Sequence, residues 1–420
     1  MTETTVISGE TETGKAGPAR VVHGPEHTGT PRLEALNLTK HFTLRTGWIG
    51  RSPHVVHAVD DISIALPEAT VTAVVGESGS GKSTLARLLT GLITPTEGEL
   101  LLDGEPVGRG EKARRAYTSS VHLVLQDPFS SLNSVHTVRY HLERPLKLHT
   151  TLRRDALENK VKELLERVAL SPAELYIDKY PHELSGGQRQ RVAIARGLAV
   201  NPRVLLADEP VSMLDVSIRL GVLNLLDGLR ENERLATMYV THDIASARYL
   251  ADTIVVMYAG QVVESGPATQ ITDSPAHPYT QLLLSAAPDP GRTVAPVLRG
   301  RGAPPSLIAP PNGCRFHPRC PFVMAVCKEQ TPPHLVAGPS QYAACWLHSP
   351  EHGGGAAQQL LQVESAAAVG SAAPGQPERA QQSEQHSEVP HQDSPVTAPE
   401  AVAPPAQEEE PPPASAPDPA

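Results

Sequence analysis

The sequence predicts an α/β fold whose parallel strands end at a phosphate-binding site, and three stretches of chain support this prediction. Val71–Val75 is a short apolar run, and Val204–Asp208 is another that ends in a carboxylate. Between them lies Gly76-Glu77-Ser78-Gly79-Ser80-Gly81-Lys82-Ser83, which reads G-x-x-x-x-G-K-S. Short β-rich apolar runs of this kind are typical of buried parallel strands. We therefore expect a strand, then this loop, then a helix.

The loop has the composition that a phosphate cradle requires. Its glycines allow backbone conformations closed to other residues, so the N–H groups from Gly76 to Thr84 can surround a pyrophosphate. Lys82 supplies a positive charge for the β- and γ-phosphates, and Ser83 supplies a hydroxyl for Mg²⁺. The helix that opens at Ser83 directs its positive end at the anion. The segment thus predicts a bound nucleoside triphosphate with Mg²⁺.

Further polar residues follow the apolar runs. Asp208 ends one run, where a carboxylate can hold Mg²⁺ through water, and Glu209 can polarise an attacking water. His242 follows the run Met238–Thr241. Because open α/β sheets bind ligands at the carboxyl ends of their strands, we expect His242 at the same site. Asp215 is expected in a turn before an amphipathic helix that carries one apolar face, made of Ile218, Val222, Leu225, Leu226 and Leu229.

A second glycine-rich segment, Leu184-Ser185-Gly186-Gly187-Gln188, leads into a helical run from Gln188 to Ala199. Free N–H groups, small side chains and a helix N-terminus make this a second anion site. The first loop already holds one triphosphate, so a second site of this kind makes sense for a nucleotide held by another chain. We therefore expect a head-to-tail dimer with two ATP molecules at its interface.

Together these segments resemble the ATP-binding subunits of ABC transporters over roughly residues 33–350. The resemblance adds Gln126, in Leu125-Gln126-Asp127-Pro128, as a residue that contacts Mg²⁺ or water and reports to the membrane subunits. It implies that Glu209 is the general base and that His242 senses the γ-phosphate. It also assigns Asp215 to communication across the dimer and Phe42 to stacking on adenine. The partner subunit's ATP would be bound by the second glycine-rich segment, namely Ser185, Gly186, Gly187 and Gln188.

The resemblance also implies a domain organisation. Residues 31–272 would form the P-loop NTPase cassette, with a RecA-like core, an antiparallel β subdomain and a helical signature subdomain at about 127–195. Within the core, Thr253–Tyr258 and Gln261–Glu264 read as a hairpin. Residues 273–349 would form a small C-terminal extension, because His277–Thr280 and Gly313–Pro321 resemble the oligopeptide/dipeptide transporter branch.

The two ends of the chain differ in composition from the rest. Residues 1–30 are rich in Thr, Glu, Gly and His, and residues 350–420 are rich in Ala, Pro, Gln and Glu. Few aliphatic residues give too little burial to offset the conformational entropy of the chain. We expect both ends to be disordered, and a solvated tail is a simpler interpretation than a docking element.

All four cysteines fall in the expected extension: Cys314, Cys320, Cys327 and Cys345. A cytosolic location disfavours disulfides. Structural zinc usually includes a close C-x₂₋₄-C pair, which this spacing lacks. Four thiolates can instead hold an iron–sulfur cluster, and transporter subunits that resemble this tail carry a [4Fe–4S] cluster. The cluster is the preferred hypothesis, and zinc or ordinary reduced thiols are the alternatives.

Bulk properties restrict the location and the partners. The chain has 420 residues and a net charge of −10, with no run of 18 apolar residues and no hydrophobic N-terminal stretch. We expect a peripheral protein on the cytoplasmic face of the cell membrane, held there by partner proteins. The acidic balance argues against a general nucleic-acid binder.

The predicted function is ATP hydrolysis that energises uptake of di- or oligopeptides. The resemblance implies a second cassette (a copy or a paralogue), two transmembrane permeases and an extracellular or periplasmic solute-binding protein as partners. Oligosaccharides or nickel chelates are alternative cargoes, because this subunit does not touch cargo. A soluble cassette ATPase of DNA repair or translation is less consistent with one cassette and no heptad run. A non-enzymatic iron–sulfur regulator is less consistent with the intact catalytic positions.

Overall fold

The computed structural model describes residues 21–44, 54–127, 131–286 and 302–352. These residues belong to one of the two compact units of the chain, residues 1–364. The predicted tails therefore lie mostly outside the described residues, as does Pro128. Among the described residues, every helix is too short or too polar to cross a bilayer.

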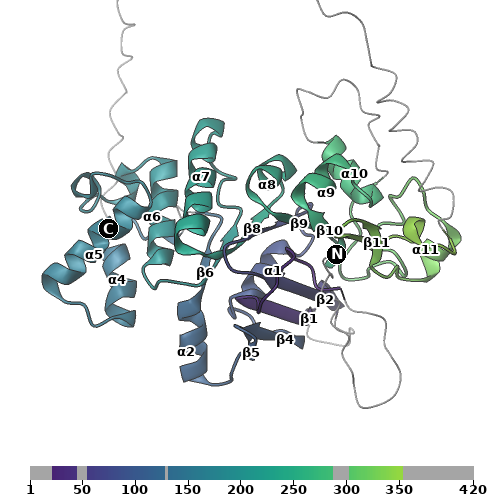
Figure 1. Cartoon of the computed structure of the whole chain (residues 1–420), viewed down its shortest axis with the longest axis horizontal. Helices are drawn as coiled ribbons and strands as arrows, with labels where there is room; N and C mark the ends of the chain where they lie inside the picture. The colour runs from purple at the N-terminus through teal and green to yellow at the C-terminus, as the bar shows by residue number, and fades with distance from the viewer. Residues whose placement is uncertain (1–20, 45–53, 128–130, 287–301, 353–420) are drawn as a thin grey trace, which may run out of the picture. The chain divides into compact units, whose positions relative to one another are not determined.

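A central mixed sheet organises the described chain, in the order β11-β12-β10-β9-β3-β8-β7-β6 (Figure 1). Its parallel part joins neighbours from β9 to β6, and its antiparallel part runs from β9 to β11. The strands are β3 (Val71–Val75), β6 (Val121–Val124), β7 (Val204–Asp208), β8 (Ala236–Thr241), β9 (Thr253–Tyr258), β10 (Gln261–Pro267), β11 (Leu335–Gly338) and β12 (Gln341–Ala343). The predicted α/β core and the β9–β10 hairpin are confirmed.

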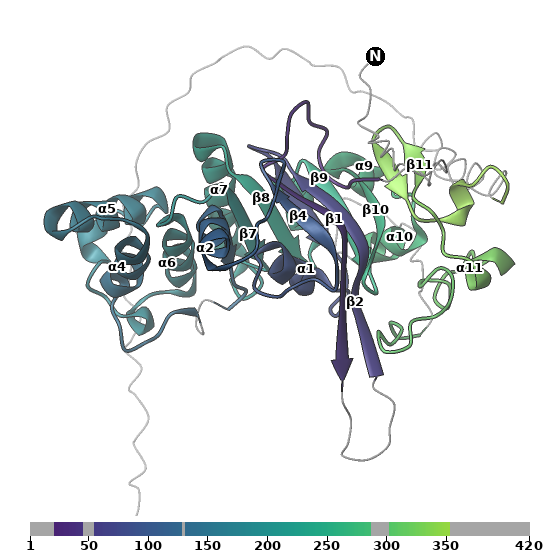
Figure 2. The same ribbon diagram turned by 90° about the horizontal axis from the view of Figure 1, so that it is seen from below.

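A separate antiparallel sheet has the order β2-β1-β4-β5. Its strands are β1 (Leu33–Leu44), β2 (His54–Leu66), β4 (Glu97–Leu102) and β5 (Glu105–Pro106). Leu33, Leu38 and Ile64 are fully buried, so one face of this sheet packs on the core. Figure 2 shows β1 and β2 side by side along their length, as their antiparallel register requires. This sheet is the antiparallel β subdomain that the resemblance implied.

Helices fill the connections between these strands. They are α1 (Lys82–Leu89), α2 (Glu111–Ser120), α4 (Val138–His149), α5 (Arg154–Arg167), α6 (Gly186–Leu198), α7 (Val216–Glu233), α8 (Ile244–Leu250), α9 (Ala268–Asp273), α10 (Pro278–Ser285) and α11 (Ala325–Glu329). Helices α4, α5 and α6 group beyond the β6 edge of the sheet, and β11 and α11 lie at the opposite edge (Figures 1 and 2). The α4–α6 group falls largely within the predicted helical subdomain.

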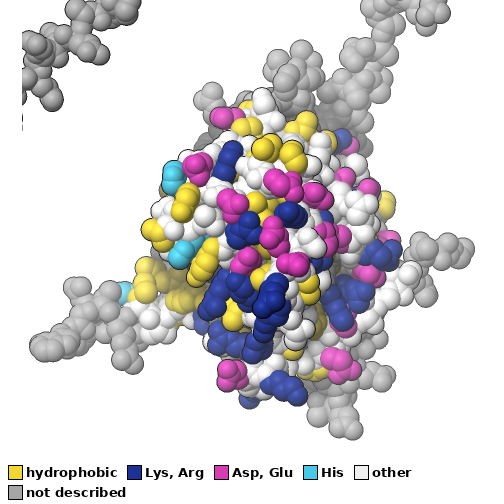
Figure 3. Space-filling view, turned by 90° about the vertical axis from the view of Figure 1, so that its left-hand side faces the viewer, with side chains coloured by type: hydrophobic (Ala, Val, Ile, Leu, Met, Phe, Trp, Pro, Cys, Tyr) yellow, Lys and Arg dark blue, Asp and Glu magenta, His cyan; other side chains and the backbone are white. Residues whose placement is uncertain are grey.

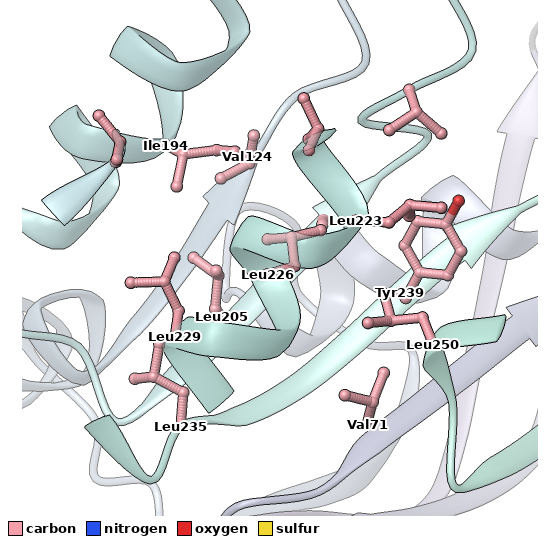
Figure 4. Packing of buried hydrophobic residues seen from close by; sticks show 14 of the residues in the cluster. Val71, Val124, Ile194, Leu205, Leu223, Leu226, Leu229, Leu235, Tyr239 and Leu250 are labelled. Atoms are coloured by element: carbon pink, nitrogen blue, oxygen red, sulfur yellow. The ribbon is translucent and has the colours of Figure 1, made fainter. Parts of the chain in front are cut away.

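Apolar packing between α7 and the sheet fixes the core. All five residues of β7 are buried, and Leu223, Leu226 and Leu229 of α7 are at most 4% exposed. Figure 4 shows these leucines close to Leu205 and Tyr239 of the sheet. Burying one such leucine contributes about 1.5–3 kcal/mol, so this layer holds the strands in register.

The parallel register places several strand ends together. Val75 pairs with Thr241 and Val256, and Ala207 pairs with Val124 and Tyr239. Because parallel strands run in one direction, the loops after β3, β6, β7 and β8 all leave the same edge of the sheet. These loops carry the motifs that the sequence singled out.

The C-terminal extension is continuous with this sheet. Strand β12 pairs with β10 through Glu264↔Ala343 and Ser265↔Tyr342. Glu264 is fully buried and accepts hydrogen bonds from the Ala276 and His277 N–H groups and from Gln341 Nε2, at 2.7–2.9 Å. Burial raises the pKa of Glu264. Its hydrogen bonds join the start and the end of the extension to β10.

The N-terminal boundary differs from the expectation of a disordered segment up to residue 30. His23 is 3% exposed, and its backbone exchanges hydrogen bonds with Ser63 and Ala65 at 3.0 and 2.8 Å. Its Nδ1 lies 2.7 Å from Ser265 Oγ. The polar composition of residues 1–30 gave no sign that His23 pairs with the backbone of β2 and contacts Ser265 of β10.

Acid should destabilise the fold through His277. This residue is 1% exposed, its Nδ1 accepts from the Tyr279 N–H at 3.0 Å, and burial lowers its pKa to about 3. Below the unfolded-state pKa of about 6.5, His277 binds a proton in the unfolded chain but stays neutral in the folded chain. The free energy of unfolding therefore falls as the pH falls. His277 alone should cost about 2 kcal/mol between pH 6.5 and pH 5.

Urea unfolding at the two pH values measures this contribution. The variant His277→Asn keeps a capping oxygen at the start of α10 and should flatten the pH dependence. An unchanged difference between the two pH values in this variant would contradict the assignment.

Candidate functional site

The loop from Gly76 to Gly81 joins β3 to α1 in the predicted order, and α1 begins at Lys82, one residue before the expected start at Ser83. Gly79 and Gly81 have φ values of 79° and 106°, in the region that favours glycine. A Cβ on Gly81 would lie 2.3 Å from the Ala58 carbonyl oxygen, so only glycine fits there. The backbone therefore turns tightly and presents its N–H groups at the carboxyl edge of the sheet. This arrangement is suited to a pyrophosphate.

Lys82 is the first residue of α1, and its side chain reaches back to the loop. Its Nζ donates to the Gly76 and Glu77 carbonyl oxygens at 2.7 and 2.9 Å, and the residue is 5% exposed. Burial lowers the pKa of Lys82, and the carboxylates of Glu209, Asp208 and Glu77 oppose that effect. A phosphate that enters the loop would meet an ammonium group already positioned at its base.

The structure brings together Ser83 and Asp208, the two residues expected to hold Mg²⁺. Ser83 Oγ donates to Asp208 Oδ1 at 3.1 Å, across 125 residues of sequence. Burial raises the pKa of Asp208, which is 4% exposed. A hydroxyl and a carboxylate are hard oxygen donors of the type that Mg²⁺ takes, so these residues fit the ion.

Glu209 is the meeting point of three chain segments. Its Oε2 accepts from Gln126 Nε2 at 3.0 Å and lies 3.3 Å from His242 Nδ1. Glu209 has a φ of 46°, and its N–H donates to the Val240 oxygen at 2.9 Å. This left-handed backbone conformation is uncommon for a residue other than glycine. The structure thus brings Gln126, Glu209 and His242 together, from the ends of β6, β7 and β8.

The signature segment differs in detail from the prediction. Helix α6 begins at Gly186, two residues before the expected start, and Ser185 is its N-cap. Ser185 Oγ accepts from the Gln188 N–H, and Gln188 Oε1 accepts from the Ser185 N–H at 2.9 Å. The glycines therefore form the first helical turn. A Cβ on Gly187 would lie 2.3 Å from Ile218 Cγ2, so packing against α7 also requires this glycine.

Asp215 and Phe42 lie apart from the Glu209 contacts. Asp215 is the exposed N-cap of α7. Phe42 lies near the end of β1 with 37% exposure, and Lys40 Nζ is 5.2 Å from its ring centroid. Stacking of Phe42 on adenine stays a prediction.

Ser212 has a contact in the site to which the sequence pattern assigned no role. Its N–H and Oγ both donate to the Glu209 carbonyl oxygen, at 3.2 and 3.0 Å. It thereby fixes the backbone of the expected general base. The position of Ser212 three residues after Glu209 was the available signal, because Ser commonly closes a turn in this way.

The four cysteines gather in the extension. Cys327 and Cys345 are buried, and Cys314 and Cys320 are partly buried. The Cys314 N–H donates to the Cys327 oxygen at 2.9 Å. Burial raises the pKa of Cys314 and Cys320 to about 11 and that of Cys345 to about 12. Backbone hydrogen bonds oppose this rise at each of these three thiols, and so they favour the thiolate.

A polar network joins the antiparallel sheet to the extension. His41, His57 and Asp60 bring three ligand atoms within 4.8 Å of one another. Arg315 donates to Asp60 Oδ2 and to the Ala259 oxygen. The Arg315 guanidinium group neutralises the Asp60 carboxylate. The cluster of His41, His57 and Asp60 therefore serves to attach the extension to the antiparallel sheet. Sequence alone could not find it, because His41 and His57 become neighbours only through the β1–β2 register.

Comparison with known proteins agrees with this geometry. A family model described as ABC transporter matches residues 59–212, and one described as the C-terminal region of oligopeptide/dipeptide transporters matches residues 263–327. The oligopeptide transport ATP-binding protein AppF of Bacillus subtilis is 42% identical over 323 residues, covering 76% of this chain and 97% of that protein. The dipeptide transport ATP-binding protein DppF of Escherichia coli is 40% identical over 321 residues, covering 75% and 94%.

A solved structure shares the fold. The protein cbiO1 of Clostridium perfringens, described as part of the ABC transporter complex cbiONQ, superposes with a TM-score of 0.51 at 28% identity. The match covers 58% of this chain and 92% of that one. With the phosphate loop and its carboxylates in place, the chain belongs to the ATP-hydrolysing ATP-binding subunits of ABC transporters, in the branch that carries the oligopeptide/dipeptide C-terminal region.

Proposed function

We propose that this chain is the motor subunit of an importer that takes up di- or oligopeptides. The observation that supports it most is the combination, in one chain, of a complete hydrolytic site with the C-terminal region of oligopeptide/dipeptide transporters. Relatives that align over more than nine-tenths of their own length are named for oligopeptide, dipeptide or di/tripeptide transport. Oligosaccharides and nickel chelates are the alternative cargoes.

The hydrolytic step follows from the position of Glu209. Its carboxylate accepts from Gln126 and lies 3.3 Å from His242, at the edge of the sheet where the γ-phosphate would lie. Glu209 takes a proton from water as the water attacks the γ-phosphorus, and the bond from that phosphorus to the β-phosphate oxygen breaks to release ADP. Gln126 orients that water, and His242 contacts the γ-phosphate. Ser83 and Asp208 would hold Mg²⁺, which would supply positive charge to neutralise the phosphates.

Two chains are needed for a complete site in this proposal. Ser185 is exposed, and the first turn of α6 carries N–H groups without helical acceptors. Such a helix end binds an anion, and the first loop of the same chain already has its own triphosphate. Ser185 to Gln188 of one chain therefore close over the ATP of the other, and Asp215 communicates between the two sites.

The helical subdomain is the proposed contact with the permeases. Gln126 begins the connection to it, and exposed apolar side chains occur along this region, among them Leu125 (40%), Val135 (68%) and Leu148 (48%). Figure 3 looks onto the α4–α6 end, where hydrophobic side chains lie between clusters of both charges. Docking here would place the chain on the cytoplasmic face of the membrane, beneath two permeases and, on the opposite side, a solute-binding protein.

We also propose that the four cysteines hold a [4Fe–4S] cluster. All four lie in the extension, where burial raises the pKa of Cys314, Cys320 and Cys345 and backbone hydrogen bonds to these sulfurs offset part of that rise. Hydrogen bonds to sulfur are typical of cluster ligands. A Zn–S bond of about 2.3 Å requires sulfurs about 3.8 Å apart, yet within the described residues no three of these thiols lie within 4.8 Å of one another. Within the described residues these thiols therefore do not form a compact tetrahedral zinc site.

Co-purification tests the transport proposal. Affinity-tagged chain extracted with detergent should bring down integral membrane permeases, and the assembled complex should hydrolyse ATP faster when a peptide-loaded binding protein is added. If an oligosaccharide- or nickel-loaded binding protein stimulated hydrolysis instead, that solute would be the cargo and the peptide assignment would be wrong. Recovery of nucleic acid or ribosomes without permeases would contradict a transport role.

Removing the general base should stop turnover without loss of nucleotide. The variant Glu209→Gln keeps the size of the side chain but cannot accept a proton, so the rate should fall by at least about 100-fold. ATP binding should persist and trap a closed dimer, visible by gel filtration. The matched control Glu174→Gln alters an exposed carboxylate of the helical subdomain and should leave the rate unchanged. Near wild-type turnover in Glu209→Gln would exclude Glu209 as the base.

Anaerobic purification tests the cluster. About four iron atoms and four acid-labile sulfides per chain are expected, and Cys320→Ser should lower both. Stoichiometric zinc, or a metal-free chain whose four thiols all react after unfolding, would contradict the cluster. The nucleotide affinity of the wild-type chain serves as a control for folding.

A further inference from the structure

The second residue of the phosphate loop is bound by the C-terminal extension. The Glu77 N–H donates to the Tyr279 hydroxyl oxygen at 2.8 Å. Its carboxylate accepts from both terminal nitrogens of Arg319, at 2.9 and 3.1 Å. Tyr279 lies in α10, and Arg319 lies between Cys314 and Cys320. Backbone and side chain of one loop residue are thus fixed from outside the cassette core.

Arg319 is well placed to act as a rigid support. Its side chain is 10% exposed, and its guanidinium carbon lies 5.8 and 5.9 Å from the ring centroids of Tyr258 and Phe316. The Tyr258 hydroxyl accepts from the same guanidinium at 3.3 Å. A bidentate Arg–carboxylate pair has a defined geometry, and stacking on aromatic faces restricts the arginine further.

The aromatic base of this support belongs to the core. Tyr258 ends β9, a neighbour of β3 in the central sheet. Its ring lies 4.5 Å from the ring of Tyr279 and 5.3 Å from that of Phe316, measured between centroids. All three rings are at most 1% exposed. Arg319 therefore connects Glu77 to a buried cluster that cannot shift without disturbing the sheet.

Glu77 is in turn one of the two carbonyl partners of Lys82. The Glu77 carbonyl oxygen accepts from Lys82 Nζ at 2.9 Å and from the Ser80 N–H at 3.2 Å. Much of the loop is glycine and serine, so its conformation is weakly restricted by its own residues. Fixing Glu77 therefore orders the loop before a phosphate arrives, and a preordered site binds more tightly.

We propose that Arg319, together with Tyr279, is a positioning residue for ATP binding, and that the extension sets the nucleotide affinity of the cassette by holding Glu77. The inference rests on the ATP site of the family, and it depends neither on the cargo nor on what the cysteines hold. It gives the C-terminal extension a role in the ATP site itself. Loss of the support should weaken ATP binding while leaving the Glu209 chemistry intact.

Nucleotide titration of the purified full-length chain tests this inference. Arg319→Ala should raise the dissociation constant of a fluorescent ATP analogue and the KM for ATP about tenfold, with kcat within twofold of wild type. Arg319→Lys keeps the charge but not the bidentate geometry and should give an intermediate value. The exchange Arg319→Glu with Glu77→Arg should recover part of the lost affinity, because it restores the ion pair.

The matched control is Arg167→Ala. Arg167 also makes a two-nitrogen pair with a glutamate, Glu233, at similar side-chain exposure, but it joins α5 to α7. Equal loss of affinity in Arg167→Ala and Arg319→Ala would overturn the inference, as would an unchanged affinity in Arg319→Ala.

Tyr279→Phe decides the matter if Arg319→Ala does not fold. This variant removes only the hydroxyl that accepts from the Glu77 N–H. An affinity about threefold weaker, with kcat retained, would support the positioning role. An affinity equal to that of the wild type would overturn it. Because these readouts use ATP alone, their failure leaves the proposed peptide cargo untouched.

Discussion

The parallel register of the central sheet is the constraint on which the site depends. Strands β3, β6, β7 and β8 run in one direction, so their carboxyl ends reach the same edge. That edge receives Ser83 with Asp208, and Gln126 with Glu209. The apolar layer between α7 and the strands keeps this register. A slip of one residue would turn the side chains of a strand to the opposite face and would separate the pairs.

The C-terminal extension is built into the cassette core and is not a separate appended segment. Strand β12 adds to the width of the central sheet, and Glu264 binds both ends of the extension. Arg315 binds Asp60, and Arg319 binds Glu77. The cysteines at positions 314 and 320 flank both arginines in sequence. The short segment from Cys314 to Cys320 therefore carries both two of the cysteines and the arginine that binds Glu77 of the phosphate loop.

Much of the ATP site of this chain could be predicted from the sequence because its parts are local. The strand–loop–helix around Gly76–Ser83, the ends of β7 and β8 and the hairpin of β9 and β10 each follow from a short pattern. The exact start of α6 was wrong by two residues, since a capping box at Ser185 allows the glycines to enter the helix. The contacts of His23, Asp60 and Arg319 could not be predicted, because they join residues more than 200 positions apart. Such pairs are set by packing and leave no local pattern.

The proposed mechanism requires two chains to enclose one ATP before it is cleaved. The dependence of the ATPase rate on the concentration of the purified chain tests it most directly, with sedimentation reporting the oligomeric state over the same range. Activity per chain should rise with concentration and level off as the dimer becomes saturated. A constant activity per chain, at concentrations where the protein is demonstrably monomeric, would contradict the account.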